Sequence, residues 1–400
     1  MRLTYQYRLR PNKQQIAIFE SWLELLRRQY NYRLAERFNW WEQNRCDIDR
    51  CSLVSCSIAP LKDKPSYHSQ ATDLPNTKSL FPEYKGVYSQ VLQECVKRVE
   101  KTCDRPLKGD VNGNRSGKPR FKGRGRYRSF TYPQMKQDCI QGKFINLPKI
   151  GRVKLILHRP IPDGFRIKTA TVARKADSWY LSLSLEDASV PAMTADVAPT
   201  ADNTVGIDMG LKSFLVTSSG EEIAIPQHYR KAEKRLQRLQ RQLSRKKKGS
   251  KRRTKAVRRV ALAHQKVANQ RQHFHYTTAL WLLGKGKAVA HEDLNVKGLA
   301  KSRLAKSVND AGWSQFLQIL SIKAERAGCL TIAVNPSGTS QNCSGCGVKV
   351  PKTLSDRWHS CACGVELSRD TNAAINVKNL ALGHRVSKAH GVRRNSGTMK

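Results

Sequence analysis

The stretch TVGIDMGLKSFLVT (Thr204–Thr217) decides the fold that we expect for this chain. Apolar residues alternate with glycine and aspartate in its first half, and a second apolar run, Phe214–Val216, follows a short turn, so the pattern predicts strands. Asp208 stands at the centre of the first run, where a carboxylate is costly unless a cation or another partner neutralises it. Gly206 and Gly210 leave room for something to approach the backbone closely. We therefore expect the rest of the chain to supply the partners of this acid.

The composition indicates a nucleic-acid partner. The 400 residues suggest two to four domains, and 73 Lys+Arg against 31 Asp+Glu give a formal net charge of +42. So large an excess repels itself unless a polyanion neutralises it, and nucleic acid is the commonest such partner. A membrane surface is the competing interpretation, but no basic amphipathic helix with a continuous apolar face stands out.

The chain has no run of about 18 apolar residues and no signal-peptide pattern. We therefore expect a soluble, intracellular protein. In such a compartment the 11 cysteines should be thiols or metal ligands and not a disulfide framework.

The first half of the chain alternates between strand and helix patterns. The alternating pattern of Leu3–Leu9 predicts a strand. Asn12 follows it and could cap a helix, because apolar residues then recur at helical spacing up to Leu34. A second helix is expected over Tyr88–Cys103. Short strand patterns over residues 144–185, separated by prolines and glycines, predict a small antiparallel barrel. If the first strand completes this barrel, the helices between them are an insertion.

Two groups of residues in this half carry no site in our interpretation. The arginines of the first helix are expected mainly on a solvent-exposed basic face: Arg27, Arg28, Arg33 and Arg37. Three cysteines stand five residues apart, which matches no zinc-ligand spacing, so free thiols are expected at Cys46, Cys51 and Cys56.

Two segments have the composition of nucleic-acid contacts. Seven basic residues and no acid lie between Arg115 and Arg128, and charge combined with interleaved aromatic rings suits phosphates and bases. Between Arg230 and Arg259 there are 16 basic residues and one acid, on a leucine pattern that predicts a helical hairpin laid along phosphates. A solvated hairpin is the alternative, although exposed helices usually mix both signs of charge. The interleaved aromatic residues are Phe121, Tyr127, Phe130 and Tyr132. The candidate contacts are Arg120, Lys122, Arg124, Arg126, Tyr127 and Arg128, then Arg245, Lys246, Lys247, Lys248, Arg252 and Arg253.

The cysteines near the C-terminus have the spacing of a zinc element. Cys343-x2-Cys346 is followed, after fourteen residues, by Cys361-x-Cys363. Four thiolates converge on one tetrahedral Zn²⁺, and because no coordination position stays open, a structural role is predicted for the metal. The second pair is one residue tighter than the usual spacing, and His359 is an alternative ligand.

Three acids form the candidate catalytic set. Asp208 lies on the first strand, Glu292 ends a second strand predicted within Lys287–Leu294, and Asp370 starts a helix just beyond the cysteines. Carboxylates brought together in this way could bind two Mg²⁺ ions about 4 Å apart and drive phosphodiester hydrolysis. The neighbouring Asp293 is not chosen, because it points to the opposite strand face from Glu292.

Four motifs in this order closely resemble the TnpB (OrfB) family of transposon-encoded nucleases, which are relatives of the type V CRISPR effectors. The motifs are GIDMGLKSFLV, AHEDLNVKGLA, the four-cysteine element preceded by NPSGTSQNCSGCG, and RDTNAAIN. The segments YRLRPNKQQ and GKPRFKGRGRYRSF resemble the front half of the same family. Two departures are visible, since Ser368 stands where the family often has aspartate, and the second knuckle is C-x-C.

The resemblance implies an RNA-guided DNA endonuclease that cuts both DNA strands in a RuvC-like (RNase H-like) α/β domain. Asp208, Glu292 and Asp370 match the family's RuvC acids, and the cysteines match its zinc-bearing target-binding element. The implied partners are a guide RNA from the transposon end and double-stranded target DNA. The implied location is the nucleoid region of a prokaryotic cytoplasm.

The implied domain order is a wedge barrel with an inserted helical recognition domain, followed by the nuclease domain with its zinc insertion. The expected ranges are 1–10 and 119–188 for the wedge, 11–118 for the recognition domain, 189–203 for a linker, 204–339 and 366–385 for the nuclease, 340–365 for the zinc element and 386–400 for a basic disordered tail.

Two other functions stay open from the sequence. A transposase proper would join DNA strands with a similar acid triad, although the order Asp-Glu-Asp with a helical last acid fits RuvC better than the Asp-Asp-Glu set of strand-transfer enzymes. A nuclease-inactive, RNA-guided DNA binder is the second alternative, and the intact triad counts against it.

Overall fold

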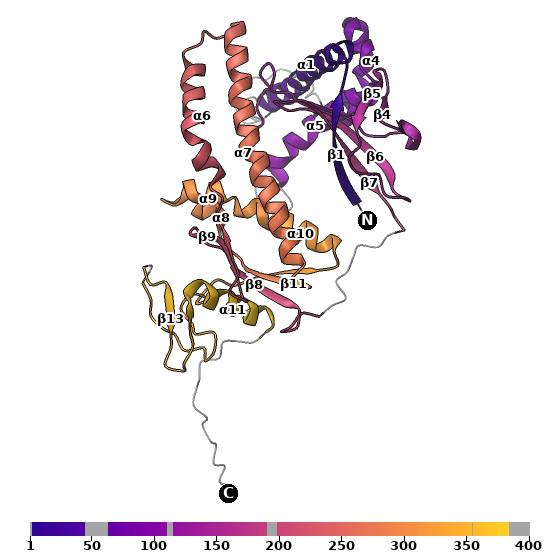
Figure 1. Cartoon of the computed structure of the whole chain (residues 1–400). Coiled ribbons are helices and arrows are strands. Elements are labelled where there is room, and N and C mark those ends of the chain that lie inside the picture. The colour runs from indigo at the N-terminus through magenta and orange to yellow at the C-terminus, as the bar shows by residue number, and fades with distance from the viewer. Residues whose placement is uncertain (1, 45–62, 110–114, 190–197, 354, 384–400) are drawn as a thin grey trace, which may run out of the picture. The chain divides into compact units, whose positions relative to one another are not determined.

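The chain divides into two compact units, residues 1–190 and 191–400, which are described separately. The computed structural model describes residues 2–44, 63–109, 115–189, 198–353 and 355–383 (Figure 1). The expectations for Cys46, Cys51 and Cys56, for most of the linker and for the basic tail fall outside the described residues.

The first unit contains one seven-stranded antiparallel sheet. Its strands are β1 (Arg2–Arg10), β2 (Ser129–Tyr132), β3 (Ile140–Gln141), β4 (Phe144–Leu147), β5 (Gly151–Ile156), β6 (Arg166–Arg174) and β7 (Trp179–Glu186). The strand order is β2-β6-β7-β1-β5-β4-β3, so the strand predicted at the N-terminus is confirmed as β1 and lies between β7 and β5. No described residues pair β2 with β3, so the hydrogen-bonded ladder is open where the pattern predicted a barrel.

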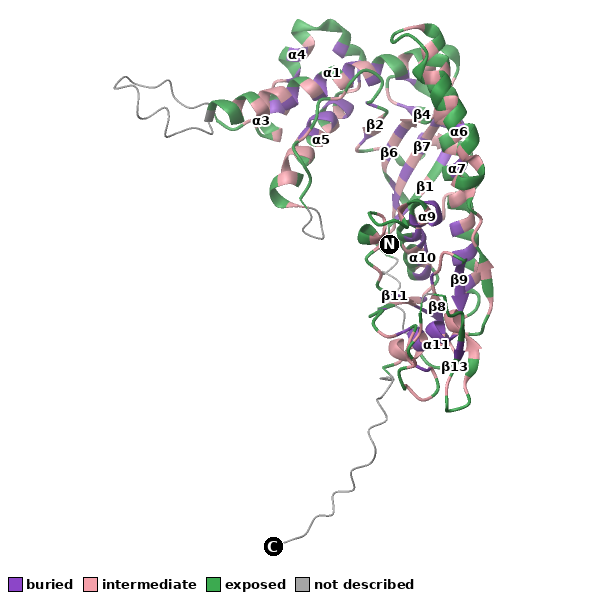
Figure 2. Cartoon of the chain, turned by 90° about the vertical axis from the view of Figure 1, so that its left-hand side faces the viewer, coloured by how far each residue is buried: buried purple, intermediate pink, exposed green. Residues whose placement is uncertain are grey.

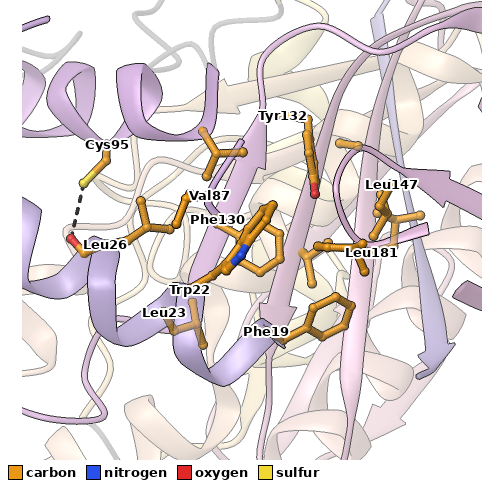
Figure 3. Close-up of a cluster of buried hydrophobic side chains, with 14 of the residues drawn as sticks. Phe19, Trp22, Leu23, Leu26, Val87, Cys95, Phe130, Tyr132, Leu147 and Leu181 are labelled. Carbon is orange, nitrogen blue, oxygen red and sulfur yellow. Dashed lines mark hydrogen bonds between the residues drawn. The ribbon is translucent and has the colours of Figure 1, made fainter. Parts of the chain in front are cut away.

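Helices cover this sheet and close its core. They are α1 (Lys13–Asn44), α3 (Tyr67–Thr72), α4 (Leu74–Leu80) and α5 (Ser89–Lys108), with 3-10 turns η1 (Pro82–Gly86) and η2 (Gln137–Cys139). Asn12 caps α1, because its side-chain Oδ1 accepts the Gln15 N–H at 2.8 Å while the Gln15 Oε1 accepts the Asn12 N–H at 3.1 Å. Phe19 and Trp22 of α1 pack against the ring of Phe130 on β2 (Figure 3). The helix predicted from periodicity therefore packs into the apolar core of this sheet.

Arg33 of α1 does not lie on a solvent-exposed face, as the sequence led us to expect. Its side chain is 1% exposed, and its guanidinium donates to the carboxylates of Glu36 and Asp73 and to the hydroxyl of Thr77. A buried guanidinium is tolerated only with such partners. Two of them, on α4 and its cap, lie 40 and 44 residues away, so the pattern around Arg33 gave no sign of them.

The second unit is built on a five-stranded sheet. Its strands are β8 (Thr204–Asp208), β9 (Ser213–Thr217), β10 (Glu222–Ala224), β11 (Ala288–Glu292) and β12 (Leu330–Val334), in the order β10-β9-β8-β11-β12. The pairs among β8, β11 and β12 are parallel, and those joining β8, β9 and β10 are antiparallel. Helices cover both faces, since Val289 packs in one cluster with α7 and α10 residues while its neighbour Ala290 packs with Val377 of α11.

The helices of this unit are α6 (His228–Ser244), α7 (Lys251–Leu283), α8 (Val296–Leu299), α9 (Ala305–Ala311), α10 (Trp313–Arg326) and α11 (Arg369–Ala381). A small hairpin of β13 (Trp358–Ser360) and β14 (Glu366–Ser368) precedes α11. The predicted helical hairpin is confirmed as α6 and α7, which lie side by side (Figure 1). At its base the buried Asp310 carboxylate accepts the N–H groups of Tyr229 and Arg230 at the start of α6. The outer surface of the hairpin is largely exposed (Figure 2).

Within the described residues, no helix is long and apolar enough to cross a membrane.

Candidate functional site

Two of the three predicted acids end adjacent parallel strands. Asp208 is the last residue of β8 and Glu292 is the last residue of β11. The two strands pair in register up to Ile207 and His291, so Asp208 and Glu292 lie side by side at the carboxyl ends of these strands. Asp208 therefore closes its strand and does not stand at the strand's centre, as the sequence pattern had indicated.

The third acid is brought to this edge by a close helix–strand contact. Asp370 lies in the first turn of α11, which Ser368 caps by accepting the Thr371 N–H at 3.0 Å. A Cβ atom at Gly206 would lie 2.1 Å from the carbonyl oxygen of Ala374, so only glycine lets α11 approach β8 so closely. The close approach predicted from the glycines is confirmed at this position, and the approaching group is the helix that carries the third acid.

Electrostatics show that the three carboxylates are neighbours. Burial, then the charges of Glu292 and Asp370, raise the pKa of Asp208 to about 7. Burial also raises the pKa of Glu292, against a hydrogen bond of 2.5 Å that its Oε1 accepts from the Thr339 hydroxyl. Asp370 forms an ion pair with Arg369 at 3.4 Å. Like charges gathered in a half-buried site are costly, and a cation would offset that cost.

The geometry limits how such cations would be held. Among the described residues, the four cysteines are the one group of three or more metal-ligand side chains whose ligand atoms all lie within 4.8 Å of one another. The ligand atoms of the three acids do not all lie within that distance of one another.

The four cysteines meet as the sequence predicted. The Sγ atoms of Cys343 and Cys363 are 3.6 Å apart, and those of Cys346 and Cys361 are 3.5 Å apart. A tetrahedral zinc with Zn–S bonds of about 2.3 Å spaces its sulfurs by about 3.8 Å, so the cluster fits one Zn²⁺ with little adjustment. The tight second knuckle does not prevent this arrangement.

The surroundings of Cys343 favour its thiolate form, which is the form that binds a metal. Its burial favours the neutral form, but the polar surroundings of its sulfur, first the Cys346 backbone and then the His359 ring, lower its pKa to about 6. His359 is fully buried and its Nδ1 contacts the Lys352 ammonium, so it lies beside the cluster and not among the four convergent ligand atoms.

A segment that the sequence analysis overlooked joins these two sites. Residues Thr339, Asn342 and Ser344 form hydrogen bonds with Asn372 and Asn376 of α11, and Thr339 also holds Glu292. The signal was present in the sequence, because the run NAAIN places two asparagines four residues apart on a helix face otherwise made of alanine and isoleucine.

The basic candidates are mostly exposed, with two corrections. Exposed side chains are found at Arg120, Arg124, Arg126, Arg128, Arg245, Lys246, Lys247, Lys248 and Arg252, and Lys122 is half-buried. Tyr127 is 7% exposed and packs against Tyr30, so its ring is not available to stack on a base. Arg253 donates to the carbonyls of Leu243 and Lys246, so it closes the tip of the hairpin.

The other interleaved rings are also mostly structural. Phe130 and Tyr132 are buried in the sheet core, because β2 pairs with β6 and turns both rings inward. Phe121 is exposed and lies edge-on to Phe38.

Family models match three parts of this chain. One described as "Probable transposase" matches residues 187–303, one described as "Cas12f1-like, TNB domain" matches residues 313–377, and one described as "Helix-turn-helix domain" matches residues 1–46. In the last range the described residues form β1 and one long helix, α1.

Curated relatives cover most of the chain. "Putative RNA-guided DNA endonuclease" of Streptomyces pristinaespiralis is 30% identical over 381 residues, which is 93% of this chain and 88% of that protein. InsQ of Escherichia coli K12, named with the same words, is 31% identical over 316 residues, 74% of this chain and 75% of that protein. "TnpB-like protein L79" of Acanthamoeba polyphaga mimivirus is 28% identical over 213 residues, 48% of this chain and 40% of that protein.

Two solved structures share the fold. A Cas12f1 in the structure titled "Cryo-EM structure of the Cas12f1-sgRNA-target DNA complex" has a TM-score of 0.55 and 16% identity, covering 92% of this chain and 83% of that chain. The "mini-RNA-guided endonuclease CRISPR-Cas_phi3" has a TM-score of 0.51 and 10% identity, covering 98% and 94%. At these identities the likeness concerns the fold alone.

Proposed function

Because the chain belongs to the TnpB (OrfB) family, we propose that it is an RNA-guided DNA endonuclease of a mobile element whose nuclease site is formed by Asp208, Glu292 and Asp370. The observation that carries the proposal is the convergence of these acids at one sheet edge, where they raise the pKa of Asp208. The order β10-β9-β8-β11-β12, with antiparallel β9 and parallel β11 beside β8, supports a RuvC-like assignment for the second unit.

The three carboxylates would hold two Mg²⁺ ions. When bound, the ions supply the activation of water and the stabilisation of the leaving oxygen in phosphodiester hydrolysis. Asp208 is near both of the other acids, since the charges of Glu292 and Asp370 both raise its pKa. With a pKa of about 7, this carboxyl group is protonated in about half of the molecules at neutral pH when no cation is bound, and cation binding would favour its ionised form. Thr339 orients Glu292 by donating to Oε1, which leaves the second carboxylate oxygen for a cation.

The basic surfaces would bind the nucleic acids. Exposed arginines at 120, 124, 126 and 128 in the first unit, and the hairpin tip at 245–248 in the second, offer charge to phosphates. We propose that these surfaces bind a guide RNA from the transposon end and the target DNA that it pairs with. The four-cysteine element would hold one structural Zn²⁺.

Guided cutting is tested by purifying the chain from cells that carry its native flanking DNA and sequencing the RNA that comes with it. One discrete, end-matched RNA is expected, and that RNA then programs plasmid cleavage in Mg²⁺. Asp208→Ala should lower the cleavage rate on the order of 10³-fold or more while RNA binding is kept. Asp293→Ala, an exposed acid beside Glu292, is the matched control and should cut within about three-fold of the wild type.

Three results would contradict the proposal. Cleavage that survives Asp208→Ala would refute the catalytic assignment. A target-joined product in place of a cut would identify a strand-transfer enzyme. Guided binding without any nicking by the wild type, in Mg²⁺ or Mn²⁺, would identify a DNA binder that does not cut.

A further inference from the structure

One buried side chain fixes the backbone on both sides of a zinc ligand. Asn372, fully buried on α11, donates from Nδ2 to the carbonyl of Asn342 at 2.7 Å and accepts at Oδ1 from the N–H of Ser344 at 2.9 Å. These two backbone groups flank Cys343, which is also fully buried. The position of this cysteine is therefore tied directly to the helix that carries Asp370.

The same helix face reaches a second acid through one more turn. Asn376, 1% exposed, donates to the carbonyls of Thr339 at 2.8 Å and Asn342 at 2.7 Å. The Thr339 hydroxyl donates to Glu292, so one short segment contacts a zinc ligand at one end and a candidate nuclease acid at the other.

These contacts are costly to leave unmade. Each buried amide or hydroxyl deprived of its partner destabilises the folded state, because no water replaces the partner. Zinc bound by the four cysteines would help to hold Cys343 and its flanking backbone in place, as metal does in small zinc elements that fold only with it. Loss of zinc would release that backbone, and the partners on α11 and Thr339 would lose their fixed positions with it.

We propose that the segment Thr339–Ser344 couples the zinc centre to the acid site, so that zinc bound at Cys343 sets the geometry with which Glu292 and Asp370 bind divalent cations. Asn372 and Thr339 are positioning residues in this scheme, because they act through the zinc ligand and through Glu292. The inference rests on the proposed function in one respect, namely that the three acids bind divalent cations.

The test measures cation binding in the absence of RNA and DNA. Mn²⁺ is titrated into the full chain and free Mn²⁺ is followed by electron paramagnetic resonance, with zinc bound and after zinc removal. Zinc removal should weaken Mn²⁺ binding by about ten-fold or more in the wild type, the size expected for outer contacts of a metal site. Asn372→Ala with zinc bound should weaken Mn²⁺ binding by a similar factor. Removing zinc from this variant should weaken Mn²⁺ binding by less than about a further three-fold, because the substitution and the loss of zinc disrupt the same contacts.

Matched variants separate coupling from general damage. Asn379→Ala lies on the same helix and removes only a 3.5 Å contact with the Ser344 carbonyl, so it should bind Mn²⁺ like the wild type. Thr339→Val should weaken Mn²⁺ binding and Thr339→Ser, which keeps the hydroxyl, should restore it. Zinc content and circular dichroism of each variant report whether the fold is intact.

Mn²⁺ affinity that is unchanged on zinc removal from the wild type would overturn the coupling. Thr339→Ser binding as weakly as Thr339→Val would overturn the role of the hydroxyl. Asp208→Ala separates this outcome from a failure of the proposed nuclease site. If that variant still binds Mn²⁺ like the wild type, the acids are not the cation site, whereas its loss of binding together with indifference to zinc refutes the coupling alone.

Discussion

Gly206→Ala tests whether the helix that carries Asp370 must touch β8 at glycine distance. The added Cβ would lie 2.1 Å from the Ala374 carbonyl oxygen and 2.7 Å from the Lys378 nitrogen, whereas real Cβ atoms essentially never come within 3.0 Å of a heavy atom. The helix must therefore withdraw by about 1 Å, since both obstacles are backbone atoms. Overpacking of this kind costs about 1–3 kcal/mol of stability. A misplacement of about 1 Å at a catalytic group costs on the order of 10²-fold in rate.

The assay compares guided plasmid cleavage and thermal unfolding of Gly206→Ala with those of Gly284→Ala. Gly284 is the control because its added Cβ meets nothing closer than 3.4 Å and its φ of −76° suits alanine. We expect Gly206→Ala to cut about 10²-fold more slowly and to unfold at a lower temperature, while the control changes little. Cutting by Gly206→Ala within about three-fold of the wild type, with unchanged unfolding, would refute the argument that this contact places Asp370.

Four further outcomes are expected. In Mg²⁺-free buffer, burial and the two neighbouring acids favour the neutral form of Asp208 in the folded protein. Its contribution to stability is therefore full below its unfolded pKa near 4 and is lost as pH rises through its folded pKa of about 7. Urea unfolding between pH 5 and 8 should show a loss of stability on the order of 3 kcal/mol, and Asp208→Asn should remove this pH dependence. Cys346→Ser should lower zinc per chain, measured by atomic absorption, and an unchanged content would contradict the four-sulfur site. Arg33→Met should destabilise the first unit by about 2 kcal/mol in urea, whereas Arg28→Met, exposed on the same helix, should cost less than about 0.5 kcal/mol. Arg126→Gln should weaken RNA binding and lower the slope of log K against log salt by about 1, and an unchanged slope would place this arginine outside the interface.

Periodicity predicted most of the elements because their burial is regular. The strand pattern around Asp208 and the helical hairpin after it alternate in the way that a sheet and two helices require, and the structure has both. The acids themselves were chosen from residue type and position, and the parallel pairing of β8 with β11 explains why residues 84 positions apart in sequence share one edge.

The failures came from partners distant in sequence. The local sequence around Arg33 indicates a surface arginine, and only the folded chain brings Asp73 beside it. Tyr127 reads as a stacking ring because its neighbours are basic, yet the following strand turns the aromatic side chains of this stretch inward. The run NAAIN made Asn372 conspicuous, but the sequence did not show that its two backbone partners belong to a loop about 30 residues earlier. In each case long-range packing and not local preference decided the environment.

The close contact between α11 and β8 determines when the three acids come together during protein synthesis. Asp208 and Glu292 are translated long before Asp370. The surface of β8 at Gly206 is covered by α11, which is translated later. A ribosome-bound chain that ends before this helix has emerged carries two of the three acids and lacks the third. Contacts between segments so far apart in sequence also form late in folding, because the intervening chain must first be closed into a loop. Asp370 would therefore join Asp208 and Glu292 only after α11 has been made and has packed against β8.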